Sequence, residues 1–303
     1  MAENNLSSGE NALQLIRHQY QRLVHLQLEV LADTDPEPLH QFRVSLRRLR
    51  TALSQFAPAL RLPDGVSSSR IAALARRTGR TRDLDVLDQR LEREILPQLP
   101  AAEARALKPV LRQLRRERDK AFAAVVVALG SDRYRKLLAR LEGWQKEPRF
   151  TVLGQQPLRA WRQEWHLPLT AALFLEAGWH ADSPEAVELH ELRKRIKGVR
   201  YSLEHLEQAI EPQGRAWIAI LKQAQTLLGD LHDWQVLEDS LRQKHSHAPS
   251  PQLTALRSGI EADRQRRWRQ WQELAGQMLQ EESRRALATL AAPPPALASD
   301  PSA

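Results

Sequence analysis

The sequence repeats itself at an offset of 150 residues, and this repeat limits the fold more than any other feature. LHQFRVSLRRLRTALSQF, which begins at Leu39, matches LHELRKRIKGVRYSLEHL, which begins at Leu189. The register then continues without a gap, because GRTRDLDVLDQRL at Gly79 corresponds to GDLHDWQVLEDSL at Gly229. Two matching blocks at one offset predict an internal duplication and a molecule with pseudo-two-fold symmetry.

Both copies of the unit are predicted to be helical. Leu, Ala, Gln, Glu and Arg dominate the chain, whereas aromatic residues make up only 5%. These dominant residues favour helices, and the residues that favour strands are few. Apolar residues recur at three- and four-residue spacing rather than in alternation. We therefore expect an all-α fold with almost no sheet.

Pro and Gly residues divide this helical pattern into segments. In the first half we expect helices over residues 12–31, 38–56, 67–78, 83–96 and 101–144, the last broken at Gly130–Ser131. In the second half we expect them over residues 158–178, 184–210, 214–228, 231–243 and 251–290. The corresponding domains are a disordered N-terminus at 1–11, a first repeat at 12–148, a linker at 149–157, a second repeat at 158–290 and a disordered tail at 291–303.

The charge balance concerns partners rather than fold. The formal net charge is +8, which leaves nucleic acid, an anionic membrane and inorganic polyphosphate as candidate partners. The chain has no cysteine, so disulfides and thiolate chemistry are excluded. Neither a signal peptide nor an apolar stretch of membrane-spanning length is recognisable. We therefore expect a cytoplasmic protein without a membrane partner.

The repeated segment places a basic face beside an apolar one on each predicted helix. At 100° per residue, the apolar stripe of the first copy consists of Phe42, Leu46, Leu49 and Leu53. The basic face beside it, about 15 Å long, consists of His40, Arg43, Arg47 and Arg50. The second copy repeats both, with Leu192, Ile196, Val199 and Leu203 beside His190, Arg193, Lys197 and Arg200.

Two interpretations of the basic faces remain open at this point. Carboxylates from other helices, such as Asp83 and Asp233, can neutralise them, because like charges one turn apart repel. Alternatively, two faces that keep the same basic positions meet around one polyanion, since Arg forms bidentate contacts with phosphate. The second interpretation is favoured by the duplication. Arg76, Arg77 and, in the second copy, Lys222 add basic residues that are either ligand contacts or a solvated face.

The sequence offers no set of residues for catalysis or for a metal. The chain contains no H-x-x-x-H, P-loop or G-x-S-x-G. His40 and His190 are better interpreted as phosphate donors, partly protonated near neutral pH. Asp83 and Asp233 are better interpreted as helix caps or partners of arginines. We therefore expect a protein that is not an enzyme and has no catalytic residues, metal or cofactor.

These paired motifs resemble the CHAD family, the conserved histidine α-helical domain. The resemblance covers residues 12–290 and implies two helical bundles with a basic channel between them. It also implies binding of inorganic polyphosphate and, in some members, association with polyphosphate granules. The implied ligand contacts are His40, Arg43, Arg47, Arg48, Arg50, His190, Arg193, Lys194, Lys197, Arg200 and Lys222. Gly198 departs from the pattern, because relatives often have a basic residue there.

Two alternative functions remain. A nucleic-acid binder has the same charge, but the chain lacks a helix-turn-helix signature and an exposed aromatic platform. A metal-dependent phosphatase acting on polyphosphate is the enzymatic alternative. Many CHAD proteins carry a fused CYTH triphosphatase domain, and its E-x-E-x-K signature is absent here. The resemblance therefore implies no triphosphatase activity.

Overall fold

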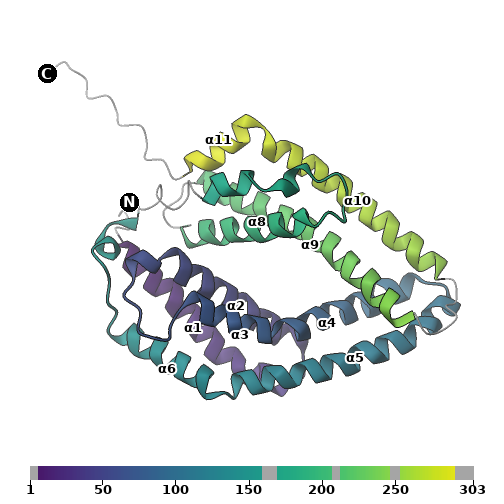
Figure 1. The fold of residues 1–303 in the computed structure, drawn as a ribbon, viewed down its shortest axis with the longest axis horizontal. Coiled ribbons are helices and arrows are strands. Elements are labelled where there is room, and N and C mark those ends of the chain that lie inside the picture. The colour runs from purple at the N-terminus through teal and green to yellow at the C-terminus, as the bar shows by residue number, and fades with distance from the viewer. Residues whose placement is uncertain (1–5, 159–168, 207–211, 246–252, 291–303) are drawn as a thin grey trace.

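Helices make up the regular structure of the chain (Figure 1). The structure is a computed structural model that describes residues 6–158, 169–206, 212–245 and 253–290. Besides helices, these residues form two isolated β-bridges, Ser7–Pro157 and Leu60–Phe150. The all-α prediction is confirmed. Across the same ranges, no helix is both long and apolar enough to cross a membrane.

The first half of the chain begins and ends its helices largely where the sequence indicates. Its α-helices are α1 (Ser8–Ala32), α2 (Pro36–Gln55), α3 (Ser68–Arg77), α4 (Gly79–Arg90), α5 (Ala101–Leu129) and α6 (Asp132–Lys146). Asp35 caps α2 by accepting a hydrogen bond from the N–H of Glu37 at 2.6 Å. Ser131 caps α6 in the same way, which confirms the break expected at Gly130–Ser131.

The first helix begins earlier than expected. Ser7 and Glu10 form a capping box in which each side chain accepts a hydrogen bond from the other's backbone N–H. This box starts α1 at Ser8, within the segment expected to be disordered. The rest of that expectation, for residues 1–5, lies outside the described residues, as does the expected tail at 291–303.

In the second half, α9 is longer than the sequence indicates, whereas α8 and α10 are shorter than the expected ranges 184–210 and 251–290. Residues 169–174 are helical, and η5 (Ala177–His180), α8 (Glu188–His205), α9 (Pro212–His245), α10 (Thr254–Leu279) and α11 (Glu281–Thr289) follow. The break expected between 228 and 231 is wrong, because α9 runs through Gly229. Leu228 and Leu231 are both buried, and this packing outweighs the cost of a helical glycine, about 1 kcal/mol.

Two apolar cores connect the halves of the chain. The larger contains the whole predicted apolar stripe of α2 together with that of α8, and every one of those eight side chains is buried. The smaller joins Leu84 and Leu87 of α4 to Trp234 of α9 and Leu256 of α10. Figure 1 shows α4 and α5 converging with α9 and α10 at the far end of the molecule. The two halves are therefore held together at two separate places.

Candidate polyanion-binding site

The helices that carry the two basic faces lie side by side and touch at their C-terminal ends (Figure 1). The Gln55 side chain donates to the carbonyl of Ser202 at 3.4 Å. Its Oε1 lies 2.9 Å from Nδ1 of His205. Gln55 and His205 occupy equivalent positions of the repeat, 150 residues apart. A contact between equivalent residues is the geometry found at a two-fold axis.

Arg43 and Arg193 are placed in equivalent ways against glycines. Arg43 donates to the carbonyl of Ala75 at 2.6 Å and to the hydroxyl of Thr78 at 2.9 Å. Its guanidinium lies over Gly79, where a Cβ would be 3.5 Å from Nη1. Arg193 lies over Gly229, where a Cβ would be 3.8 Å from Nε. Each arginine thus lies within ordinary contact distance of the repeated glycine, Arg43 at α4 and Arg193 at α9.

A cavity of about 530 Å³, here called the central cavity, lies between α2 and α8. Its basic lining residues are Arg47, Arg50, Lys194, Arg195 and Lys197. Both helices therefore contribute cations to one space. Arg47 and Lys197, which are equivalent in the repeat, are half-buried there.

Lys197 has an unusually cationic environment. Burial lowers its pKa most, and the nearby guanidiniums of Arg193, Arg47, Arg200 and Arg43 lower it further, to about 7. Among the described residues, no carboxylate forms an ion pair with Lys197. In the same part of the chain, the buried Nε atoms of Arg47 and Arg193 have no hydrogen-bond partner. Asp83 acts on both Arg43 and Arg193, and Asp233 acts on Arg193, so carboxylates offset part of the positive charge. The described part of the fold still leaves these two Nε donors without a protein partner.

Glu204 neutralises part of the predicted basic set. Its carboxylate lies 3.2 Å from Nη2 of Arg48 and also pairs with Arg200. Arg200 is only 7% exposed, donates to Gln225 at 3.1 Å and lies over the ring of Tyr201. Arg200 and Arg48 are therefore held by protein groups, whereas Arg50, the counterpart of Arg200, is exposed at the central cavity.

The histidines of the two faces lie beside other basic groups. Burial first, and then Arg82, lowers the pKa of His40. Burial first, and then Lys194 and Arg193, lowers the pKa of His190. Both imidazoles are therefore largely neutral at neutral pH, whereas the sequence suggested partial protonation. A neutral imidazole still carries one N–H that can donate to an anion.

A second cavity of about 280 Å³ lies between α8 and α9. His190 and His232 line it with their ring centroids 5.4 Å apart, and Arg193 borders it one turn before Lys197. Burial and the neighbouring cations lower the pKa of His232 to about 4. His232 takes the position that Arg82 takes beside His40, so the pair of basic groups recurs in both halves.

The remaining predicted residues lie at the margin of this arrangement. Arg76 and Arg77 are exposed in the last turn of α3, and Lys222 is exposed on α9. Lys194 lines the central cavity and pairs with Glu191 at 2.6 Å. Sequence reasoning did not assign Arg195, which lines the cavity and lies 2.8 Å from Glu176. The repeat gives no signal for it, because its counterpart is Ser45.

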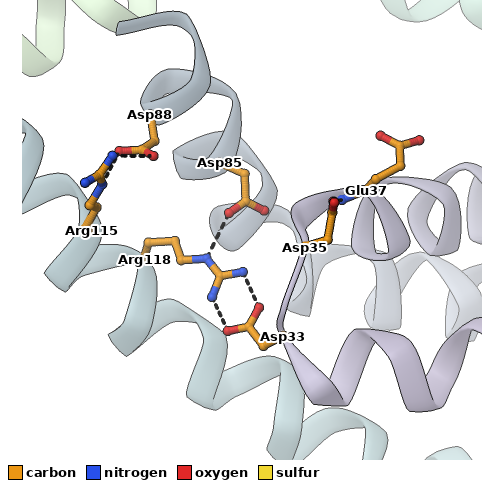
Figure 2. Close-up of polar contacts among 7 residues, drawn as sticks. All are labelled: Asp33, Asp35, Glu37, Asp85, Asp88, Arg115 and Arg118. Atoms are coloured by element: carbon orange, nitrogen blue, oxygen red, sulfur yellow. Dashed lines mark hydrogen bonds and ion pairs between the residues drawn. The ribbon is translucent and has the colours of Figure 1, made fainter. Parts of the chain in front are cut away.

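An acidic cluster elsewhere serves the fold. Figure 2 shows Arg118 of α5 between Asp85 of α4 and Asp33 at the end of α1. The Nε of Arg118 donates to Asp85 at 2.8 Å, and its two terminal nitrogens donate to Asp33. Burial raises the pKa of Asp85, and the bond from Arg118 opposes that rise. In the described ranges, no three His, Asp or Glu side chains converge as metal ligands would.

Fold and site together define an all-helical protein with a cationic cavity between two similar helices. The family model of the CHAD domain matches residues 14–242, which is most of the chain. This protein therefore belongs to the CHAD family, as the paired motifs of the sequence indicate.

Solved structures show the same fold. The CHAD domain from the plant Ricinus communis has a TM-score of 0.66 and 22% identity, over 95% of this chain and 94% of that one. PptA from Streptomyces chartreusis has a TM-score of 0.62 and 20% identity, over 91% of this chain and all of that one (100%). Among curated proteins, none matches the sequence closely enough to count as a relative.

Proposed function

We propose that this protein binds inorganic polyphosphate between the basic faces of α2 and α8 and does not catalyse its turnover. The observation that carries the proposal is the meeting of Arg47 and Lys197 from equivalent positions in one cavity, with cationic donors left unpaired. A linear chain of identical anions presents the same groups in both directions, so it suits two similar faces. Charge-assisted hydrogen bonds to its oxygens would satisfy these donors.

The architecture supports the same proposal. The contact of Gln55 with His205, and the arginines over Gly79 and Gly229, are expected if two bundles arose by internal duplication. The basic channel between the bundles would then be the central cavity, which residues of both α2 and α8 line. Membership of the CHAD family adds to this support, because the resemblance implies polyphosphate binding. A cytoplasmic location, expected from the sequence, and association with polyphosphate granules, which the resemblance implies for some members, are part of the proposal.

The first experiment tests the cavity as the binding site. Arg47→Gln combined with Lys197→Gln should weaken binding of long-chain polyphosphate by at least tenfold, because it removes two central cations. Arg133→Gln combined with Lys136→Gln is the matched control, since it removes the same charge from exposed positions of α6. Affinity is measured by calorimetry at two salt concentrations, with helical circular dichroism as a check on folding. Equal losses in the two double variants would contradict the assignment of the cavity.

Competition experiments separate the proposal from its alternatives. Polyphosphate should compete more strongly than duplex DNA or RNA at physiological salt, and orthophosphate should compete poorly. A preference for nucleic acid would favour the nucleic-acid binder. Phosphate release from polyphosphate in the presence of Mg²⁺ or Mn²⁺ would instead reveal a phosphatase.

A further inference from the structure

Lys197 is an amine at the wall of an open cavity and is surrounded by guanidinium groups. It lines the central cavity together with Arg47 and Arg50 of α2. Lys194 lines the same cavity from the same helix, but its ammonium lies 2.6 Å from the carboxylate of Glu191. The two lysines therefore share a cavity and differ in their partners.

The groups that face Lys197 from each neighbouring helix are almost all cationic or basic. Arg43 and Arg47 act on it from α2, and Arg193 and Arg200 act on it from α8. His190 of α8 and His232 of α9 also interact with its charge. Asp233 and Asp83 act on Arg193, and Glu204 pairs with Arg200.

This environment produces a neutral amine near physiological pH. With a pKa of about 7, much of Lys197 is unprotonated at pH 7.5, compared with about one in a thousand for an ordinary lysine. An unprotonated amine has a lone pair with which it can attack an electrophile. Its lower basicity weakens the nucleophile and offsets part of this gain.

We propose that Lys197 is a site of covalent modification, at which its Nζ takes an acyl group from small anionic donors of the acyl phosphate class. The surrounding guanidiniums would hold the phosphate of the donor, and the amine beside them would attack its carbonyl carbon. The anion-binding groups and the nucleophile thus lie in one cavity.

The reaction balances without a further reactant. The Nζ–C bond forms as the C–O bond to the phosphate breaks, and the phosphate leaves with the electron pair of that bond. The ammonium formed at Nζ loses one proton to the phosphate or to water. The products are an amide at Lys197 and inorganic phosphate.

Modification would have a direct effect on the charge of the cavity. An amide cannot be protonated at neutral pH, so the modified site loses a cation that an anionic ligand would otherwise stabilise. The proposal shares its cavity with polyphosphate binding but does not rest on it, because the reactivity of the amine is independent of the natural ligand.

The test is site-resolved acetylation of the full chain by acetyl phosphate, followed by mass spectrometry over pH 6 to 9. Lys197 should be acetylated at least tenfold faster than Lys194 at pH 7.5, with a rate that levels off above pH 7. Inorganic phosphate should slow the reaction at Lys197. Arg47→Gln should also slow it, whereas Arg133→Gln should not. p-Nitrophenyl acetate, a neutral donor, should show a smaller preference for Lys197.

The outcomes are distinct. Acetylation of Lys197 no faster than that of Lys194 would overturn the proposal, as would an unchanged rate in Arg47→Gln. Polyphosphate affinity of the unmodified protein is measured separately. Rapid acetylation without polyphosphate binding would contradict the proposed function and support the modification site. Polyphosphate binding without rapid acetylation of Lys197 would support the proposed function and contradict the modification site.

Discussion

Single residues show that the two basic faces are not paired equally with acids. Arg50 and Arg200 are equivalent in the repeat, yet Arg50 is exposed at the central cavity and Arg200 is buried. The difference comes from Glu204, which pairs with Arg48 and Arg200 and stands where the first copy has Ser54. The repeat could predict which positions are basic. It could not predict this pairing, because the contact between Arg48 and Glu204 spans 156 residues.

Lys197 should make polyphosphate binding depend on pH. Its pKa of about 7 in the free protein should rise when an anion binds, so binding takes up a proton. Affinity should be full below pH 7 and fall as the pH rises toward 9, by as much as about 100-fold if the pKa returns to its ordinary value. Calorimetry in buffers of different ionisation enthalpy measures the uptake.

Lys197→Arg provides the control for this pH dependence. Arginine remains protonated throughout the range, so the variant should bind with little change between pH 7 and 9. Long-chain polyphosphate is used as the ligand, because it has few terminal phosphates, and their own titration then contributes little to the pH dependence. A variant that kept the full pH dependence would show that another group takes up the proton.

The same lysine should make the folded protein less stable at low pH. Its folded pKa lies below the ordinary value, so below pH 7 folding places a cation among other cations, and this cost disappears as the pH rises toward 10. Lys197→Met should therefore raise the free energy of unfolding by about 1–2 kcal/mol at pH 6.5, after allowance for solvent screening. Urea unfolding at pH 6.5 and 9.5 measures the change.

The comparison variant is Lys136→Met, at an exposed position of α6. It should change stability by less than about 0.5 kcal/mol. A Lys197→Met protein less stable than the parent at pH 6.5 would mean that its charge is compensated in the fold.

At the scale of helices, the sequence predicts where a helix starts better than it predicts whether the helix continues through a glycine. Capping residues such as Asp35 and Ser131 act on their own helix, so their signal is local. Gly79 and Gly229 are equivalent, but α3 ends at Arg77 just before the first and α9 runs through the second. Thr78 is buried and bonded to Ala75 and Arg43 at the interruption, whereas its counterpart, Leu228, packs into the core. Packing of this kind depends on distant residues.

Substitutions at two glycines should separate helix propensity from close packing. Gly229→Ala should stabilise the protein by about 0.5–1 kcal/mol, because the new Cβ meets Arg193 at 3.8 Å, an ordinary contact. Gly178→Ala should destabilise it, since a Cβ there would lie 2.6 Å from the carbonyl oxygen of Glu188. Thermal unfolding of both variants measures the contrast. Destabilisation by Gly229→Ala would indicate that the Arg193 side chain cannot move to accommodate the new Cβ.

At the scale of the whole molecule, the smaller core connects the far ends of the two halves. Leu87 of α4 is buried there with Trp234 and Leu237 of α9. Leu87→Ala should lower the free energy of unfolding by about 2–5 kcal/mol. It should destabilise both halves of the chain, because helices of both halves pack into the smaller core. Hydrogen exchange should then become faster in α2 and α8 as well as in α4 and α9. Faster exchange confined to α4 and α9 would show that the halves unfold separately.

The contact between Gln55 and His205 has a consequence for how such a chain could arise. Equivalent residues meet there as they would in a homodimer. A shorter protein with one unit could make the same contact only with a second copy of itself, so its assembly would depend on concentration. Joining two such units in one polypeptide would remove that dependence and would let the two sides evolve separately. Arg48 and Gly198, or Ser54 and Glu204, show that equivalent positions already differ in charge.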